Sequence, residues 1–98
     1  MATSFLTDDL GFYILKDPVS ILDYEIDWET WLDVDTILTS NFTVEAGLTK
    51  ASQSLTATKG IVWLSGGTLG ETYLVSNTIT TAGGRTENRE FRVLIANK

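Results

Sequence analysis

The chain has 98 residues, enough for one small domain, and 43% of them are hydrophobic, which excludes a compositionally disordered protein. It contains no cysteine and no histidine, so disulfides, thiol nucleophiles, imidazole bases and zinc sites built on these ligands are excluded. The formal net charge of −6 opposes binding to nucleic acid, and no apolar run is long enough to span a membrane. We therefore expect a non-enzymatic protein that needs no cofactor or metal.

The charges are distributed unevenly along the chain. Up to Glu45 there are ten acidic residues and one lysine, whereas the remainder has six basic and three acidic residues. Within one molecule an acidic strand could lie near a basic C-terminal hairpin; between molecules, the acidic end of one copy could meet the basic end of the next. We favour pairing within the chain or simple solvation, because exposed ion pairs are common and individually weak.

The first 18 residues predict an arm outside the main domain. Their apolar residues keep neither the two-residue period of a strand nor the 3.6-residue period of a helix. Pro18, which lacks an N–H, separates them from the first clear strand. An uncovered arm of this kind would expose large apolar groups, which monomers usually avoid. We expect it to dock on another protein through Phe5, Phe12, Tyr13 and Ile14.

Residues 19–98 predict a β-sandwich. From Leu22 to Trp28 apolar and acidic residues alternate, which is typical of a strand with one buried and one solvated face. One helical turn is expected over 29–34 and a hairpin turn at Gly83-Gly84, because paired glycines adopt the positive φ of tight turns. Other short strands recur between turn-forming segments, as in antiparallel sandwiches. They are expected over residues 38–44, 61–64, 73–79 and 91–95.

Tyr73 makes the predicted fold class more specific. It follows a glycine-containing corner, Gly67 to Gly70, and is the first inward residue of its strand. This arrangement resembles the tyrosine corner of immunoglobulin-like and fibronectin-like sandwiches, in which the phenol bonds a backbone group upstream. We therefore predict an antiparallel β-sandwich of that kind. Its expected structural residues are Trp28, Trp31, Trp63 and Tyr73.

The acidic face of the first strand has a second interpretation as a calcium site. Its carboxylates recur every two residues and so lie roughly 7 Å apart, too far for one tight cage. A solvated face that protects the sheet edge is the interpretation that we favour. The residues concerned are Asp23, Glu25, Asp27 and Glu29.

Several short motifs resemble a family of small structural proteins of tailed bacteriophages and prophages. The resemblance runs from about Leu15 to the C-terminus and implies a non-enzymatic virion or assembly component, whose gene commonly lies among head and head–tail connection genes. It carries over no catalytic residue. The motifs are Lys16-Asp17-Pro18, Leu22-Asp23-Tyr24, Asp27-Trp28, Trp31-Leu32 and Trp63-Leu64-Ser65-Gly66-Gly67.

The function expected from this resemblance is docking onto other phage structural proteins, with self-association as a further option. We expect a role in head decoration or in head–tail joining rather than a position in the tail. The protein is expected in the bacterial host cytoplasm during assembly and afterwards in the virion. The alternative is a small carbohydrate- or calcium-binding module on a host-facing part of the particle. An exposed Trp63 or Trp31 would favour the carbohydrate module, whereas burial of all three tryptophans would favour the docking role.

Overall fold

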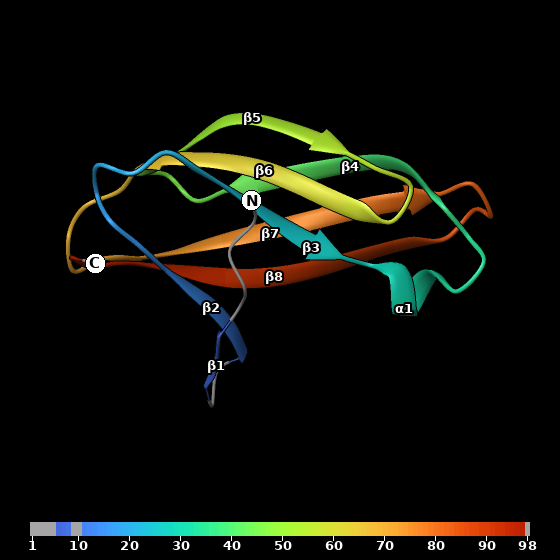
Figure 1. Cartoon of the computed structure of the whole chain (residues 1–98), viewed down its shortest axis with the longest axis horizontal. Coiled ribbons are helices and arrows are strands. Elements are labelled where there is room, and N and C mark those ends of the chain that lie inside the picture. The colour runs from blue at the N-terminus through green and yellow to red at the C-terminus, as the bar shows by residue number, and fades with distance from the viewer. Residues whose placement is uncertain (1–5, 9–10, 98) are drawn as a thin grey trace.

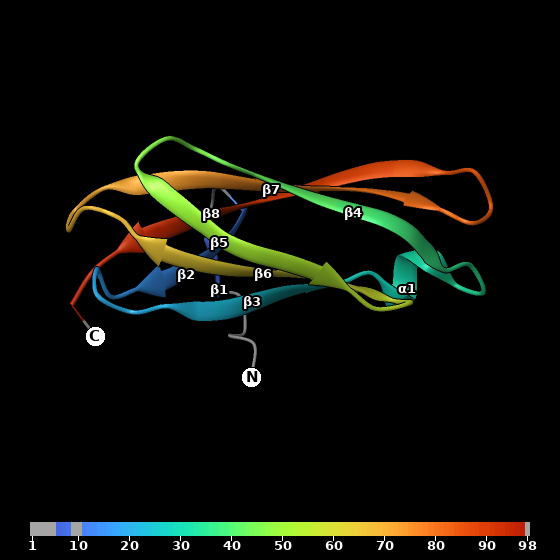
Figure 2. The same ribbon diagram turned by 90° about the horizontal axis from the view of Figure 1, so that it is seen from above.

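The protein consists of two β-sheets packed face to face (Figures 1 and 2). The computed structural model describes residues 6–8 and 11–97, with side chains from Tyr13 onward. Its elements are β1 (Leu6–Asp8), β2 (Gly11–Lys16), β3 (Leu22–Asp27), α1 (Glu29–Leu32), β4 (Ile37–Val44), β5 (Leu48–Leu55), β6 (Lys59–Gly66), β7 (Thr72–Thr81) and β8 (Thr86–Ile95). One sheet has the order β1-β2-β8-β7-β4 and the other the order β3-β6-β5. The predicted all-β sandwich is confirmed.

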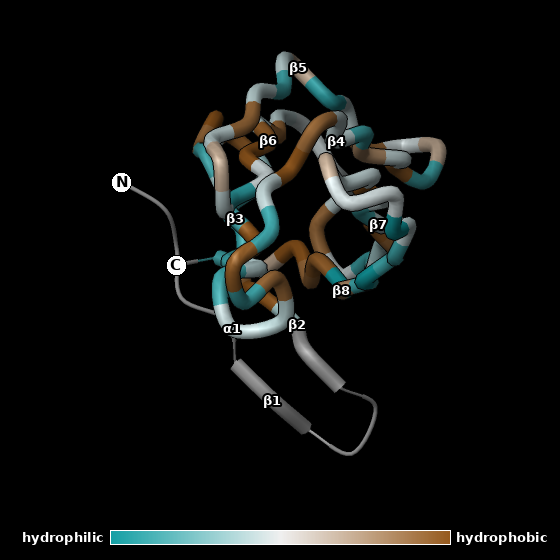
Figure 3. Tube along the Cα trace, turned by 90° about the vertical axis from the view of Figure 1, so that its right-hand side faces the viewer, coloured by the Kyte–Doolittle hydropathy of each residue, from teal (hydrophilic) through white to brown (hydrophobic). Residues whose placement is uncertain are grey.

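Side-chain alternation places one face of each sheet in the core. In β3, Tyr24 and Ile26 point inward and are buried, whereas Glu25 between them lies on the outer face. The helical turn expected after this strand is α1, and the expected glycine turn joins β7 to β8, with Gly84 at a φ of 87°. Figure 3 shows hydrophobic stretches of strands from both sheets around the interior.

The strand β5 is stabilised mainly by contacts with neighbouring strands, because its own side chains bury little apolar surface. Seven of its eight residues are exposed, and its backbone pairs with β6. Two of its side chains reach across to β4 in the other sheet. The Gln53 Oε1 accepts the N–H of Phe42 at 2.9 Å, and the Lys50 Nζ donates to the Phe42 carbonyl at 3.0 Å. These bonds satisfy backbone groups at the free edge of β4, where an uncovered strand would invite aggregation.

The corner tyrosine has the predicted geometry. The Tyr73 hydroxyl accepts a hydrogen bond from the backbone N–H of Thr68 at 3.0 Å. Thr68 lies in the connection between β6 and β7, so the bond fixes the path of the chain from one sheet to the other. The immunoglobulin-like assignment stays a prediction, and this corner is the feature that supports it.

The segment before Pro18 differs from the predicted arm. β2 pairs in parallel with β8, with Ile14 opposite Val93, and the Ile14 side chain is 0% exposed. Ile14 therefore belongs to the core and cannot anchor a partner. The predicted boundary at residue 18 needs correction, because the five-stranded sheet already includes residues 11–16. Figure 1 shows β1 at the free edge of this sheet, beyond β2.

Lys16 strengthens the attachment of β2 to the sandwich. Its side chain is buried, and its Nζ donates to the carbonyl of Gly66 at 2.7 Å and to that of Asp17 at 2.9 Å. Burial lowers the pKa of Lys16, while the charge of Asp17 acts in the opposite direction. Gly66 ends β6, so this lysine joins the two sheets at one end of the molecule.

The core also contains a hydrogen-bonded polar group. Trp28 is fully buried, and its indole N–H donates to the Asn77 Oδ1 at 2.9 Å. The Asn77 Nδ2 donates in turn to the Ser40 Oγ at 2.8 Å. A Cβ added at Gly60 would lie 2.6 Å from the Asn77 Oδ1, so the glycine leaves the space that the amide occupies. These hydrogen bonds hold the Trp28 ring in one orientation in the core.

Candidate docking surfaces

The outer face of the five-stranded sheet is polar over β4 and the neighbouring parts of β7 and β8. Asn41 lies opposite Thr78, which lies opposite Asn88, so one row across three strands carries only amides and a hydroxyl. The Asn88 Nδ2 donates to the Thr78 Oγ1 at 2.7 Å. The next row, Thr39–Thr80–Thr86, is again entirely hydroxyl. This part of the face is suited to contact with water.

The same face becomes apolar toward β2. Pairing across the strands places Tyr13 beside Arg92 and Arg92 beside Leu74, with Leu15 beside Leu94 in the next row. The Leu74 side chain is 44% exposed, and the other four are partly buried. Apolar side chains gathered around an arginine on an otherwise polar sheet face are a feature of contact surfaces. We call these five residues, Tyr13, Leu15, Leu74, Arg92 and Leu94, the outer patch.

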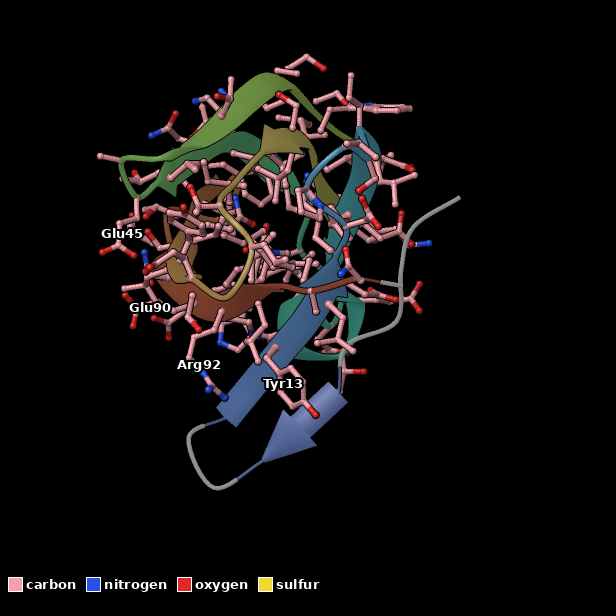
Figure 4. The ribbon with its side chains drawn as sticks, turned by 90° about the vertical axis from the view of Figure 1, so that its left-hand side faces the viewer. Tyr13, Glu45, Glu90 and Arg92 are labelled. Carbon is pink, nitrogen blue, oxygen red and sulfur yellow. The ribbon has the colours of Figure 1, made fainter. Side chains whose placement is uncertain are left out.

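Charged side chains order the outer patch and its border (Figure 4). The Arg92 guanidinium carbon lies 5.5 Å from the centre of the Tyr13 ring, within the range of a cation–π contact. The Glu45 Oε1 accepts the backbone N–H of Leu74 at 2.8 Å. Glu90 lies on the side of Arg92 away from Tyr13 in this view. The outer patch thus has an arginine at its centre and carboxylates on one side.

The four interface residues expected from the sequence have different environments. Phe5 lies outside the described residues. Phe12 pairs through its backbone with Thr7 of β1, and its side chain is also outside the described part. Tyr13 contributes to the outer patch, and Ile14 is in the core. The run Phe12-Tyr13-Ile14-Leu15 lacks a clear period because β2 has apolar side chains on both of its faces.

Sequence reasoning missed Leu74 and Leu94. Each interrupts the expected alternation with an apolar residue at an outward position, Leu74 between the inward Tyr73 and Val75. Consecutive apolar residues in a strand indicate that both faces are covered. That pattern could have identified the outer patch once the strands were assigned.

The outer face of the three-stranded sheet carries a second exposed aromatic group. Trp63 lies in the central strand β6 and is 40% exposed, with Ile61 on the same side of the strand. Trp63 was expected to be a structural residue, but it does not fill the core, because Val62 and Leu64 are the inward residues of β6. Of the other tryptophans, Trp28 is buried and Trp31 packs against the core.

At the α1 end of the sandwich, Asp35 and Arg85 connect α1 to the β7–β8 hairpin. The Arg85 Nε lies 3.2 Å from the Asp35 Oδ2, and its Nη2 donates to the Leu32 carbonyl at 2.9 Å. The Asp35 Oδ1 accepts the N–H of Gly83 at 3.0 Å. Hydrogen bonds from the Thr81 side chain, from backbone N–H groups and from Arg85 lower the pKa of Asp35 to about 2.

Beside this ion pair lies an open depression with an apolar residue at its rim. It is lined by Leu32, Asp33, Val34, Asp35, Gly83 and Arg85. Val34 is 92% exposed, and Asp33 before it has a φ of 59°, in the left-handed region that non-glycine residues rarely adopt. In the part of the chain that the structure describes, no group of three or more acidic side chains could hold a metal ion.

The acidic and basic halves of the chain are partly paired within the molecule. Arg85 pairs with Asp35, and the Lys59 Nζ lies 3.5 Å from the Glu25 Oε1. The Arg89 Nη1 also donates to the carbonyl of Asp27 at 3.1 Å. These contacts agree with the intramolecular interpretation of the charge asymmetry. None of the helices in the described ranges is long and apolar enough to cross a membrane.

Comparison with protein families places the chain among phage proteins. Residues 16–94 match the model of a family described as "Podophage GP4 fiber-tail adaptor protein gp77". A search among curated proteins found no match. The predicted resemblance to small phage structural proteins is confirmed, whereas the preference for the head over the tail disagrees with the family description. The chain belongs to the podophage fiber-tail adaptor protein gp77 family and is a structural protein of a phage virion that binds other phage proteins.

Proposed function

We propose that this chain is a non-enzymatic adaptor that joins a tail component of a podophage particle to a fibre component. The family description supports a tail position, so a tail role is proposed in place of head decoration and head–tail joining. The chain would act by docking, after assembly in the cytoplasm of the bacterial host. An adaptor of this kind needs surfaces that are stable before they meet a partner, and a sandwich supplies them as rigid sheet faces.

The outer patch is the observation that carries this proposal. Tyrosine and arginine are enriched among residues that dominate binding energy, and here Arg92 is ordered against Tyr13 before any partner arrives. Leu74, Leu94 and Leu15 supply apolar area around the pair, and the hydroxyl-rich rows beyond them supply a polar rim. Anchors that are already ordered lose little conformational freedom on binding.

Reconstitution of particles tests this function. Particles assembled from a genome that lacks the gene for this chain should carry few or no fibres. Addition of the purified chain and purified fibres together should restore fibres that are visible by electron microscopy, whereas fibres alone should not. Fibre attachment of equal extent without the chain would contradict the adaptor role.

The exposure of Trp63 favours a carbohydrate-binding module as a second candidate function. An exposed indole on a flat face can stack on a sugar ring, and hydroxyl groups of β5 lie beside it. Binding of host polysaccharide to the isolated chain, lost in Trp63→Ala, would favour this candidate. Unchanged tryptophan fluorescence with such polysaccharides would exclude it.

A further inference from the structure

Trp63 lies at the centre of the outer face of the three-stranded sheet. It is opposite Asp23 of β3 on one side and Ser52 of β5 on the other. Ile61, two residues earlier on β6, is opposite Glu25 and is partly exposed. An apolar pair with polar neighbours on both sides has the composition of an interface centre with its rim.

The two sides of this apolar pair differ in charge. The β3 side carries the carboxylates of Asp23, Glu25 and Asp27, whereas the outward residues on the β5 side include Ser52 and Ser54. In the described part of the chain, Lys59 lies opposite Asp27 and forms its ion pair with Glu25. On this part of the described sheet face, three carboxylates and one lysine surround an exposed indole, so a cationic partner complements it.

Two other tryptophans of this protein already hold an arginine side chain over the indole ring. The Arg85 guanidinium lies 4.2 Å from the centre of the Trp31 ring and pairs with Asp35. The Arg89 guanidinium lies 4.3 Å from the centre of the Trp28 ring and donates to the carbonyl of the neighbouring Asp27. Each indole thus works together with an oxygen acceptor beside it, a pairing that suits a planar guanidinium.

Trp63 likewise has an acidic residue beside it, because Asp23 lies opposite it on β3. The three arginines of the chain lie over other aromatic rings. Arg85, Arg89 and Arg92 lie over Trp31, Trp28 and Tyr13 respectively. We propose that the Trp63 face is a second docking surface, and that it receives an arginine side chain from a segment of another virion protein. This inference rests on the proposed adaptor function, which requires two partners.

The positions of the two surfaces allow both partners to bind together. The outer patch lies on the outer face of the sheet that contains β2, β7 and β8, and Trp63 lies on the outer face of the sheet that contains β3, β5 and β6. The core separates the two faces, as the layers in Figure 1 show. A partner on one face therefore does not cover the other.

The test measures the two associations of an adaptor separately. The first is binding of the purified chain to fibreless particles, and the second is binding of purified fibres to particles already loaded with the chain. Trp63→Ala should weaken one of these associations at least about tenfold, as expected for the loss of a central aromatic residue. Leu38→Ala, which removes an exposed apolar side chain from β4, is the matched control and should leave both unchanged.

Charge and chemistry separate an arginine from other occupants. The association that depends on Trp63 should weaken as NaCl is raised and should weaken further in Glu25→Lys. A photo-reactive residue at position 52 should cross-link to a partner peptide that contains arginine. Retention of both associations by Trp63→Ala, a cross-linked segment without arginine, or competition by neutral sugars would overturn the inference.

These outcomes are distinct from failure of the adaptor function itself. If the wild-type chain binds neither particles nor fibres, the proposed function fails, and the inference fails with it. If the wild-type chain joins the two while Trp63→Ala does so equally well, the function stands and only the assignment of this surface is wrong.

Discussion

The Tyr73 hydroxyl lies 3.0 Å from the backbone N of Thr68, whose N–H it accepts. The bond joins the start of β7 to the loop that brings the chain from the opposite sheet. The backbone at Gly47 packs closely against the Tyr73 ring, because a Cβ at Gly47 would lie 2.7 Å from a Tyr73 ring carbon. Gly47 has a φ of 105°, a conformation that L side chains rarely adopt.

Tyr73→Phe should lower the free energy of unfolding by about 0.5–1.5 kcal/mol, because it removes one hydrogen bond and leaves the ring in place. Tyr73→Ala should cost several times as much, since it leaves a cavity of aromatic size. Urea unfolding of both variants checks this. A neutral Tyr73→Phe together with a costly Tyr73→Ala would show that the ring matters and the corner bond does not.

Tyr24→Phe should have the opposite outcome. The Tyr24 hydroxyl is buried and has no hydrogen-bond partner among the described residues, and burial raises its pKa to about 12, with a smaller contribution from Asp23. Removal of an unsatisfied buried hydroxyl should leave stability unchanged or raise it by up to about 1 kcal/mol. The same urea series measures it, and a loss of more than about 1 kcal/mol would indicate a bonded hydroxyl.

Acid should weaken the ion pair at the α1 end. The pKa of Asp35 is about 2 in the folded chain, below its ordinary value, so protonation favours the unfolded chain. The contribution of this carboxylate is complete above about pH 4 and is lost as the pH falls toward about 2. Asp35→Asn should therefore be less stable than the wild type at neutral pH, and the difference should shrink in acid. A difference that stays constant from neutral pH to about pH 2 would contradict this assignment.

β2 should prove essential to the fold. Ile14→Ala should lower the free energy of unfolding by about 2–4 kcal/mol, because Ile14 is fully buried opposite Val93. Tyr13→Ala, one residue earlier on the outer face, should cost less than about 1 kcal/mol. Deletion of residues 1–16 should leave the remaining chain largely unfolded by near-ultraviolet circular dichroism. A folded truncation, with equally small costs for both substitutions, would restore the idea of a separate arm.

Sequence patterns predict the parts of this fold that depend on neighbouring residues. The β3 alternation, the turn at α1, the glycine hairpin and the Tyr73 corner are all encoded within a few positions. β2 is different, because its strand character depends on parallel pairing with β8 at the other end of the chain. β5 buries only Leu48 in the core, and it is ordered by bonds such as that from the Phe42 N–H to the Gln53 side chain. No local pattern contains either relationship.

The candidate surfaces were predicted less well than the fold, for a related reason. An apolar run such as Ile61-Val62-Trp63-Leu64 indicates a strand, but it does not show which of its two faces the core covers. In the structure Val62 and Leu64 fill the core, so Trp63 lies outside. The sequence predicts Tyr13 as an interface residue, which stays a prediction, whereas Leu74 and Leu94 become its neighbours only through the pairing of β2, β8 and β7.

The most direct measurement is fibre attachment to reconstituted particles with a charge placed in the outer patch. Leu74→Asp adds a carboxylate to this patch at an exposed position, and Asn41→Asp adds the same group to the polar part of the same sheet face. Both variants should fold. We predict that Asn41→Asp restores fibres as the wild type does and that Leu74→Asp does not. Full restoration of fibres by Leu74→Asp would contradict it.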